Sequence, residues 1–94
     1  MCRSVIFSIH AVRRMFARGL TEDDIRHIVS TGEVIEDYPD DEPFRSRVIL
    51  GYCGNRPVHV VVAENIEKDQ RIIVTAYEPC RTKWDETFKR RIKK

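Results

Sequence analysis

Four side chains in this sequence are of types that together could act on a phosphodiester: His10, Arg14, His59 and Tyr77. A histidine can take or give a proton near neutral pH, a tyrosine hydroxyl can position or donate one, and an arginine can hold two phosphate oxygens at once. These groups suit metal-independent cleavage of RNA, in which the ribose 2′-hydroxyl attacks the adjacent phosphate and cations stabilise the phosphorane. The hypothesis requires the four side chains to converge in the fold.

The segment 7–19 must position the first two of these residues, and its pattern predicts an amphipathic helix. Ser8 is the expected N-cap, and Gly19 is the expected left-handed C-cap. At about 100° per residue, one polar arc carries His10, Arg13, Arg14 and Arg18. The opposite arc, which we expect to be buried, holds Ile9, Ala11, Val12, Met15 and Phe16. We therefore predict that Arg13, Arg14 and Arg18 bind nucleic acid.

A second helix and several strands are predicted after this one. Thr21 and Asp24 form a capping box, and Gly32 ends the helix that follows. Strand-like segments lie at 34–38, 47–52, 57–64 and 71–77, with a Gly54-Asn55 turn between the second and third. The expected fold is a single α+β domain over 1–94, with two N-terminal helices packed on an antiparallel sheet of three or four strands.

The C-terminal segment is strongly basic and is predicted to form a short helix or tail. Trp84, Phe88 and Ile92 have helical spacing, and Thr82 and Asp85 are placed to cap. The aromatic pair is expected to dock on the body. This would hold outward a second group of nucleic-acid-binding residues, Lys89, Arg90 and Arg91. A frayed, solvated basic end is the alternative.

Both candidate histidines also have a structural interpretation. His59 lies in an apolar strand, where a histidine is either a hydrogen-bonded core residue or, beside Tyr77, part of a site. His10 lies in the first turn of its helix, where the helix dipole favours a neutral imidazole. It acts there as a base or simply helps to lock the turn.

Charge and composition narrow the class of protein. The net charge is +2, but residues 1–18 hold four arginines and no acid, whereas 33–42 hold six acids and no base. If the two basic ends meet, they attract polyanions. The three cysteines and three histidines are scattered, so neither a disulfide framework nor a metal or other cofactor site is expected. No signal peptide or membrane-spanning run is recognised, and we expect a cytoplasmic protein.

The order of motifs carries a family resemblance that covers nearly the whole chain. The motifs are Phe7-Ser8-x-His10-Ala11-x-x-Arg14-Met15-x-x-Arg18-Gly19-Leu20, Gly32-Glu33-x-Ile35-Glu36-x-Tyr38-Pro39, Gly51-Tyr52, Arg56-Pro57-x-His59-Val60-Val61, Tyr77-Glu78-Pro79 and Trp84. This order resembles that of a family of small bacterial proteins of unknown function grouped with the RelE, BrnT and MqsR toxin-like proteins. The chain has Cys80 where relatives commonly place an acid.

The resemblance implies a RelE-like fold, usually encoded beside an antitoxin, and in better-studied relatives the activity is cleavage of messenger RNA. Its motif histidines and arginines correspond to His10, Arg14, Arg18 and His59. The leading hypothesis is therefore a toxin-type, metal-independent endoribonuclease that acts on RNA, with or without the ribosome, and has an antitoxin partner. The alternative is a non-catalytic domain that uses the same basic face to bind RNA or a partner protein.

Overall fold

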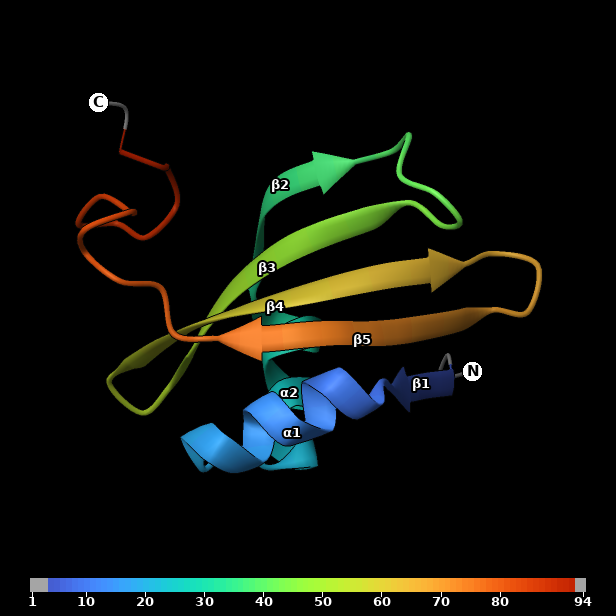
Figure 1. Cartoon of the computed structure of the whole chain (residues 1–94), viewed down its shortest axis with the longest axis horizontal. Coiled ribbons are helices and arrows are strands. Elements are labelled where there is room, and N and C mark those ends of the chain that lie inside the picture. The colour runs from blue at the N-terminus through green and yellow to red at the C-terminus, as the bar shows by residue number, and fades with distance from the viewer. Residues whose placement is uncertain (1–3, 93–94) are drawn as a thin grey trace.

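The computed structural model of the protein describes residues 4–92, which form two helices and five strands (Figure 1). The elements are β1 (Ser4–Phe7), α1 (Ile9–Arg18), α2 (Glu22–Thr31), β2 (Glu33–Tyr38), β3 (Ser46–Cys53), β4 (Arg56–Asn65) and β5 (Gln70–Tyr77). The expected α+β class is confirmed. The predicted helices and the four predicted strands match α1, α2 and β2 to β5 to within a residue or two.

The sheet has the strand order β1-β5-β4-β3-β2, and β1 runs parallel to β5 while the other pairs are antiparallel. The prediction of three or four antiparallel strands was therefore wrong in both number and direction. The missed strand, β1, has only four residues, and it pairs Ser4 with Gln70 near the other end of the chain. A strand this short gives no recognisable period of its own.

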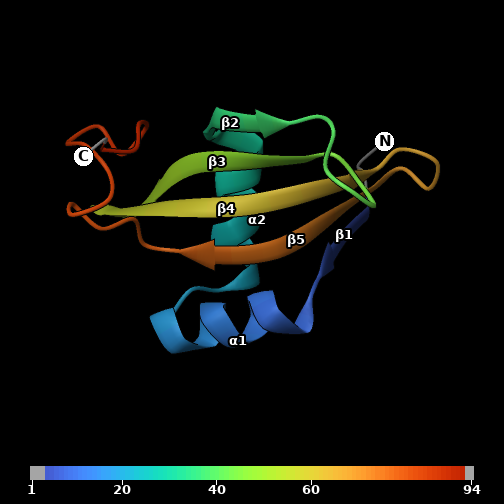
Figure 2. The ribbon, with the colours of Figure 1, turned by 45° about the horizontal axis from the view of Figure 1, so that its top comes forward.

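In Figure 2, α2 lies behind the sheet and the tail lies at the left-hand end of the strands. Along β4, Val58 and Val60 are fully buried and belong to the core that also contains Ala11 of α1 and Ile25 of α2. Because successive side chains of a strand alternate between faces, His59 points to the other side, where Trp84 of the tail packs against its ring. One face therefore holds the main core, and the other holds His59 under the tail.

The caps of α1 form as predicted, but its packing does not. Ser8 accepts a hydrogen bond from the Ala11 amide, and Gly19 ends the helix with φ 67°. The two buried residues of α1 are Ala11 and Met15. The prediction that the whole apolar arc is buried was wrong for Ile9, Val12 and Phe16, which are exposed. The helix lies along the β5 side of the sheet, so the sheet covers a narrow strip of it.

The second helix has the predicted capping box, in which Thr21 and Asp24 each accept the other's amide hydrogen. At its end, Gly32 is packed so closely that an added Cβ would lie 2.6 Å from the carbonyl oxygens of Ile28 and Leu50. The helix therefore turns directly into β2 at a position that has no room for a side chain.

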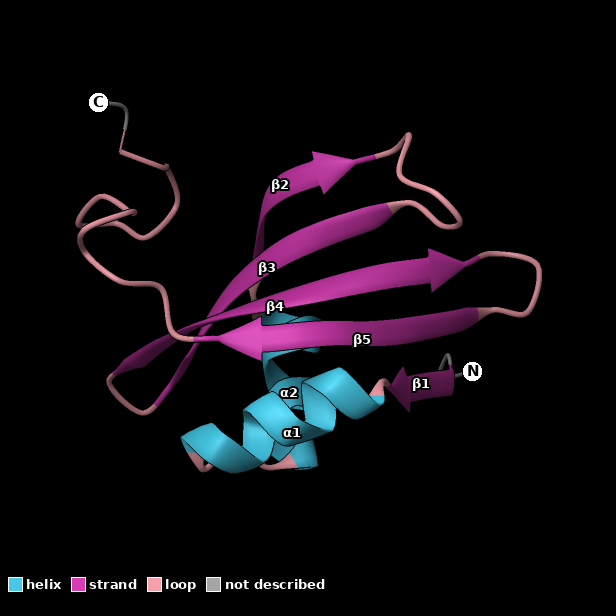
Figure 3. Ribbon diagram, viewed as in Figure 1, coloured by secondary structure: helices cyan, strands magenta, loops and turns pink. Residues whose placement is uncertain are grey.

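The C-terminal segment is not a helix, which corrects that part of the prediction (Figure 3). It folds back on itself, since the Asp85 amide donates to the Arg90 carbonyl and the Ile92 amide donates to the Lys83 carbonyl, both at 2.9 Å. These hydrogen bonds connect residues too far apart in sequence for an α-helix. Trp84 docks on the body as expected and is 3% exposed.

Candidate functional site

His59 sits at the junction between the sheet and the tail, and both of its ring nitrogens have partners. Its Nε2 lies 2.7 Å from the Phe88 carbonyl oxygen, and its Nδ1 lies 3.3 Å from the Tyr77 hydroxyl. A carbonyl can only accept, so Nε2 carries the hydrogen and Nδ1 accepts from the tyrosine. Burial lowers the pKa of His59, which keeps the ring neutral in this arrangement.

The structure brings His59 and Tyr77 together, as the functional interpretation required, but it seals the histidine from solvent. His59 is 0% exposed, and the Trp84 ring meets it edge to face with centroids 4.4 Å apart. Substrate cannot reach an imidazole that is covered in this way. The geometry favours the core-histidine interpretation, in which His59 anchors the tail and orients Tyr77.

Tyr77 itself borders open space. It lines a small pocket of about 210 Å³ together with Glu78, Pro79, Cys80, Lys83, Trp84 and Arg91. Burial also raises the pKa of the Tyr77 hydroxyl, so this group is a proton donor and not an anion near neutral pH. The Cys80 thiol is exposed at the same pocket, and the Thr82 hydroxyl beside it lowers its pKa.

His10 and Arg14 lie on α1 and do not join this pocket's lining. The helix packs on the face of the sheet opposite the one to which His59 points. The four residues expected to act together are therefore divided: His59 and Tyr77 lie under the tail, and His10 and Arg14 lie on the exposed side of a helix. The shared four-residue site is not assembled in this conformation.

The arginines of α1 form the clearest cationic feature of the described residues. Arg13, Arg14 and Arg18 are all exposed, and within residues 4–92 no carboxylate forms an ion pair with any of them. The end of the helix is held by Arg56, whose guanidinium donates to the Arg18 carbonyl at 2.6 Å and to Glu78 at 2.6 Å. The guanidinium groups of α1 thus remain available to an anion from outside.

Two cations of the tail form ion pairs with acids of β2. Lys89 pairs with Glu33 at 3.2 Å, and Arg91 pairs with Glu36 at 3.5 Å while lying over the Trp84 ring. Both side chains are exposed, as predicted, at 47% and 59%, but their charges also link the tail to β2.

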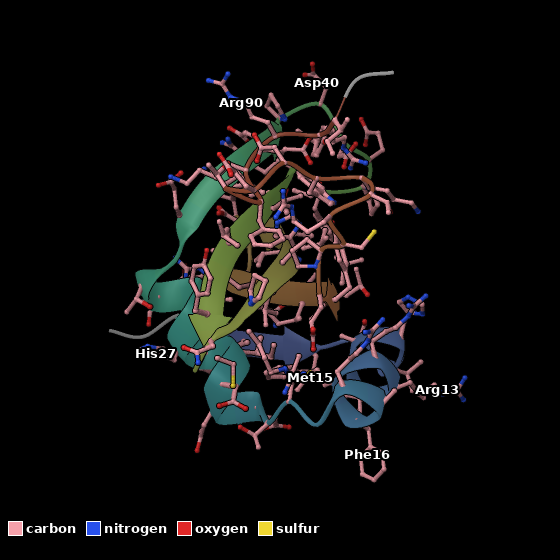
Figure 4. All side chains as sticks on the ribbon, turned by 90° about the vertical axis from the view of Figure 1, so that its left-hand side faces the viewer. Arg13, Met15, Phe16, His27, Asp40 and Arg90 are labelled. Atoms are coloured by element: carbon pink, nitrogen blue, oxygen red, sulfur yellow. The ribbon has the colours of Figure 1, made fainter. Side chains whose placement is uncertain are left out.

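Arg90 remains exposed, but it does not extend the basic face of α1. Figure 4 shows Arg90 at one end of the molecule and Arg13 at the other. Arg90 and Arg13 therefore do not belong to one basic patch. The nucleic-acid-binding roles predicted for Lys89, Arg90 and Arg91 receive less support from this geometry than those predicted for the helix.

Two features of the site were not predicted from the sequence. Arg56 links the end of α1 to Glu78, a contact that depends on the fold and has no local signal. Phe16 was assigned to the buried arc but is 89% exposed on the helix that carries the arginines. The helical spacing places Phe16 correctly on its arc, but it does not say how much of that arc the sheet covers.

Acidic side chains gather elsewhere. The loop after β2 and the loop after β4 border a groove of about 770 Å³ whose acidic residues are Asp40, Asp41, Glu42, Glu64 and Glu67. Within the described residues, no group of three or more histidines, cysteines or acids is placed to hold a metal ion. No helix in this part of the chain is long and apolar enough to cross a bilayer.

The fold and these surfaces define a small α+β domain in which a cationic helix borders a mixed five-stranded sheet. By sequence, the chain belongs to the DUF4258 family, a domain of unknown function, whose model matches residues 7–78. The match spans α1, α2 and β2 to β5, and it ends before Trp84 and the rest of the tail. No curated protein and no solved structure matches the chain.

Proposed function

We propose that this protein binds RNA, with the arginines of α1 gripping the phosphate backbone. The observation that carries the proposal is the set of three exposed guanidinium groups without ion-pair partners in the described chain: Arg13, Arg14 and Arg18. A guanidinium binds two phosphate oxygens in one plane, and unpaired surface cations attract a polyanion over several ångströms. A cytoplasmic location belongs to this proposal, because messenger and ribosomal RNA are found there.

Salt dependence of binding tests this proposal. Each phosphate neutralised on a single strand contributes about −0.7 to the slope of log K against log salt, so three contacts predict a slope near −2. Changing all three arginines to glutamine should weaken binding and flatten the slope by about this amount. The matched control changes Lys89, Arg90 and Arg91 to glutamine, which removes the same charge from the tail. Equal loss in both variants would contradict a specific role for α1.

A toxin-type, metal-independent endoribonuclease is the second proposal, and the pocket beside Tyr77 favours it. The Tyr77 hydroxyl could turn its hydrogen from His59 Nδ1 to a leaving 5′-oxygen, while Lys83 and Arg91, which line the same pocket, stabilise the phosphorane and solvent water takes the proton of the attacking 2′-hydroxyl. The helical hairpin against a small sheet also agrees with the RelE-like fold that the motifs imply. RNA cleavage, with and without ribosomes, is the direct test.

Two substitutions separate the proposals. If Tyr77 donates the proton, Tyr77→Phe abolishes cleavage but leaves RNA binding intact, whereas Arg14→Ala weakens both. Binding without cleavage by the native protein leaves the RNA-binding proposal standing alone. Expression of the chain by itself should arrest growth if it is a toxin, and co-expression of an antitoxin encoded beside it should relieve the arrest.

A further inference from the structure

One large apolar side chain on α1 is almost fully in solvent. Phe16 is 89% exposed. It forms an apolar stripe along the helix with two smaller residues, Ile9 and Val12, which are 72% and 43% exposed. Figure 4 shows Phe16 pointing away from the body of the protein, whereas its sequence neighbour Met15 is buried. Packing against the sheet therefore does not explain why an aromatic residue stands at this position.

One arginine flanks this ring on the same ten-residue helix, and the other two lie on the far side of the helix. Residues three apart on a helix are surface neighbours, so Arg13 lies beside Phe16 on the outward side. Single-stranded nucleic acids are commonly bound by this pairing of residue types, in which cations follow the backbone and aromatic rings stack on unpaired bases. A duplex offers the same phosphates but keeps its bases stacked inside.

We infer that Phe16 is a stacking platform for an unpaired base, so that α1 binds single-stranded RNA in preference to duplex. This inference rests on the proposed RNA binding and adds the kind of RNA that is bound. Ile9 and Val12 provide an apolar floor next to the stacked base, and Arg13 holds the adjoining phosphate.

Two other occupants of the stripe are less well supported. A second copy of this chain packed through the stripe would bring the Arg13 side chains that border it close together, which is unfavourable for like charges. A partner protein with an apolar face would cover Phe16 as well, but it gives no reason for an aromatic ring over an aliphatic side chain. The experiment below distinguishes this case.

The test uses a short single-stranded RNA with 2′-O-methyl groups, which cannot be cut by attack of its own 2′-hydroxyl, and the same strand annealed to its complement. Phe16→Ala should lower affinity for the single strand roughly five- to a hundredfold, the loss of one stacked base, and leave duplex affinity unchanged. Phe16→Tyr should retain single-strand affinity, and Phe16→Leu, which keeps an apolar side chain but no ring, should lose it. Thermal unfolding controls for folding, and we expect no change because the side chain is exposed.

The outcomes distinguish a failure of the RNA-binding proposal from a failure of the inference that Phe16 stacks on a base. If the triple arginine variant weakens binding to both RNAs but Phe16→Ala and Phe16→Leu change neither, RNA binding stands and the stacking inference is overturned in favour of a protein-docking stripe. If the triple arginine variant changes nothing, the RNA-binding proposal itself fails. Full single-strand affinity in Phe16→Leu would also overturn the inference, because an aliphatic side chain cannot stack.

Discussion

Replacing His59 by phenylalanine should loosen the tail without leaving a large hole. The new ring can still meet Trp84 edge to face, but the Phe88 carbonyl and the Tyr77 hydroxyl lose their partner. A buried polar group left without a hydrogen bond costs about 1–3 kcal/mol, so we expect His59→Phe to lower the free energy of unfolding by about 2 kcal/mol. His59→Ala adds a cavity and should cost about 3–5 kcal/mol.

Trp84 gives a direct measure of tail docking, because it is the one tryptophan in the chain and lies against His59. Urea unfolding followed by far-ultraviolet circular dichroism reports the sheet, and Trp84 fluorescence reports the tail. In His59→Phe we expect the fluorescence transition to occur at lower urea concentration than the circular dichroism transition. Tyr77→Phe, which removes only the weaker of the two hydrogen bonds, serves as the milder control.

The pH dependence of the same measurement has a defined sign. Burial lowers the pKa of His59 in the folded protein, so the unfolded chain binds the proton more readily. Stability from this residue is constant above the unfolded pKa near 6.5 and is lost as the pH falls below it, by at most about 1.4 kcal/mol per pH unit. His59→Phe should show none of this loss between about pH 7 and 5.5. The reasoning is refuted if native protein and variant lose equal stability over that range.

Three further substitutions test local features of the fold. Gly32→Ala should cost about 2 kcal/mol or more, measured by urea unfolding, because the new Cβ would lie 2.6 Å from the Ile28 carbonyl oxygen. Ser8→Ala should cost about 1 kcal/mol, since it removes the N-cap of α1 and a hydrogen bond to the Val74 carbonyl; Ser8→Asp should restore the cap alone. Arg91→Lys keeps the charge but loses the planar contact with the indole, so tryptophan emission should change while stability falls by less than about 1 kcal/mol.

The helix ends could be predicted because their signals are local. Ser8 and Gly19 bound α1, and the Thr21 and Asp24 capping box begins α2, each through contacts within a few residues. Three or four neighbouring residues contain all the information that such a cap requires. The β3–β4 hairpin follows the same rule, since Gly54 takes φ 65° at its turn.

Features that depend on distant residues could not be predicted in this way. The pairing of β1 with β5 has no local signal, and the docking of the tail depends on hydrogen bonds to His59 and across the segment 83–92. The helical period identified the apolar arc of α1 correctly. How much of that arc is buried, and hence the exposure of Phe16, depends on where the sheet ends.

In the candidate site, too, some features could be predicted from the sequence and others depend on contacts between distant residues. Sequence reasoning paired His59 with Tyr77 and grouped the arginines of α1, and the structure has both groupings. It could not determine that a strand residue and a helix residue lie on opposite faces of the sheet, which separates His59 from His10. Sequence alone also gave no means of knowing that the acids of β2 pair with the cations of the tail.

Because β1 pairs with β5 and α1 packs against β5, α1 can take its place on the sheet only after β5 has been synthesised. When β1 and α1 leave the ribosome, the strand along which both lie has not yet been made. The long-range pairing must wait for residues 70–73 of β5, and closing so long a loop costs more entropy than closing a short one. A nascent chain therefore cannot present α1 on its sheet until nearly all of the domain has been translated. Fragments that end before β5 would therefore lack the strand against which α1 packs.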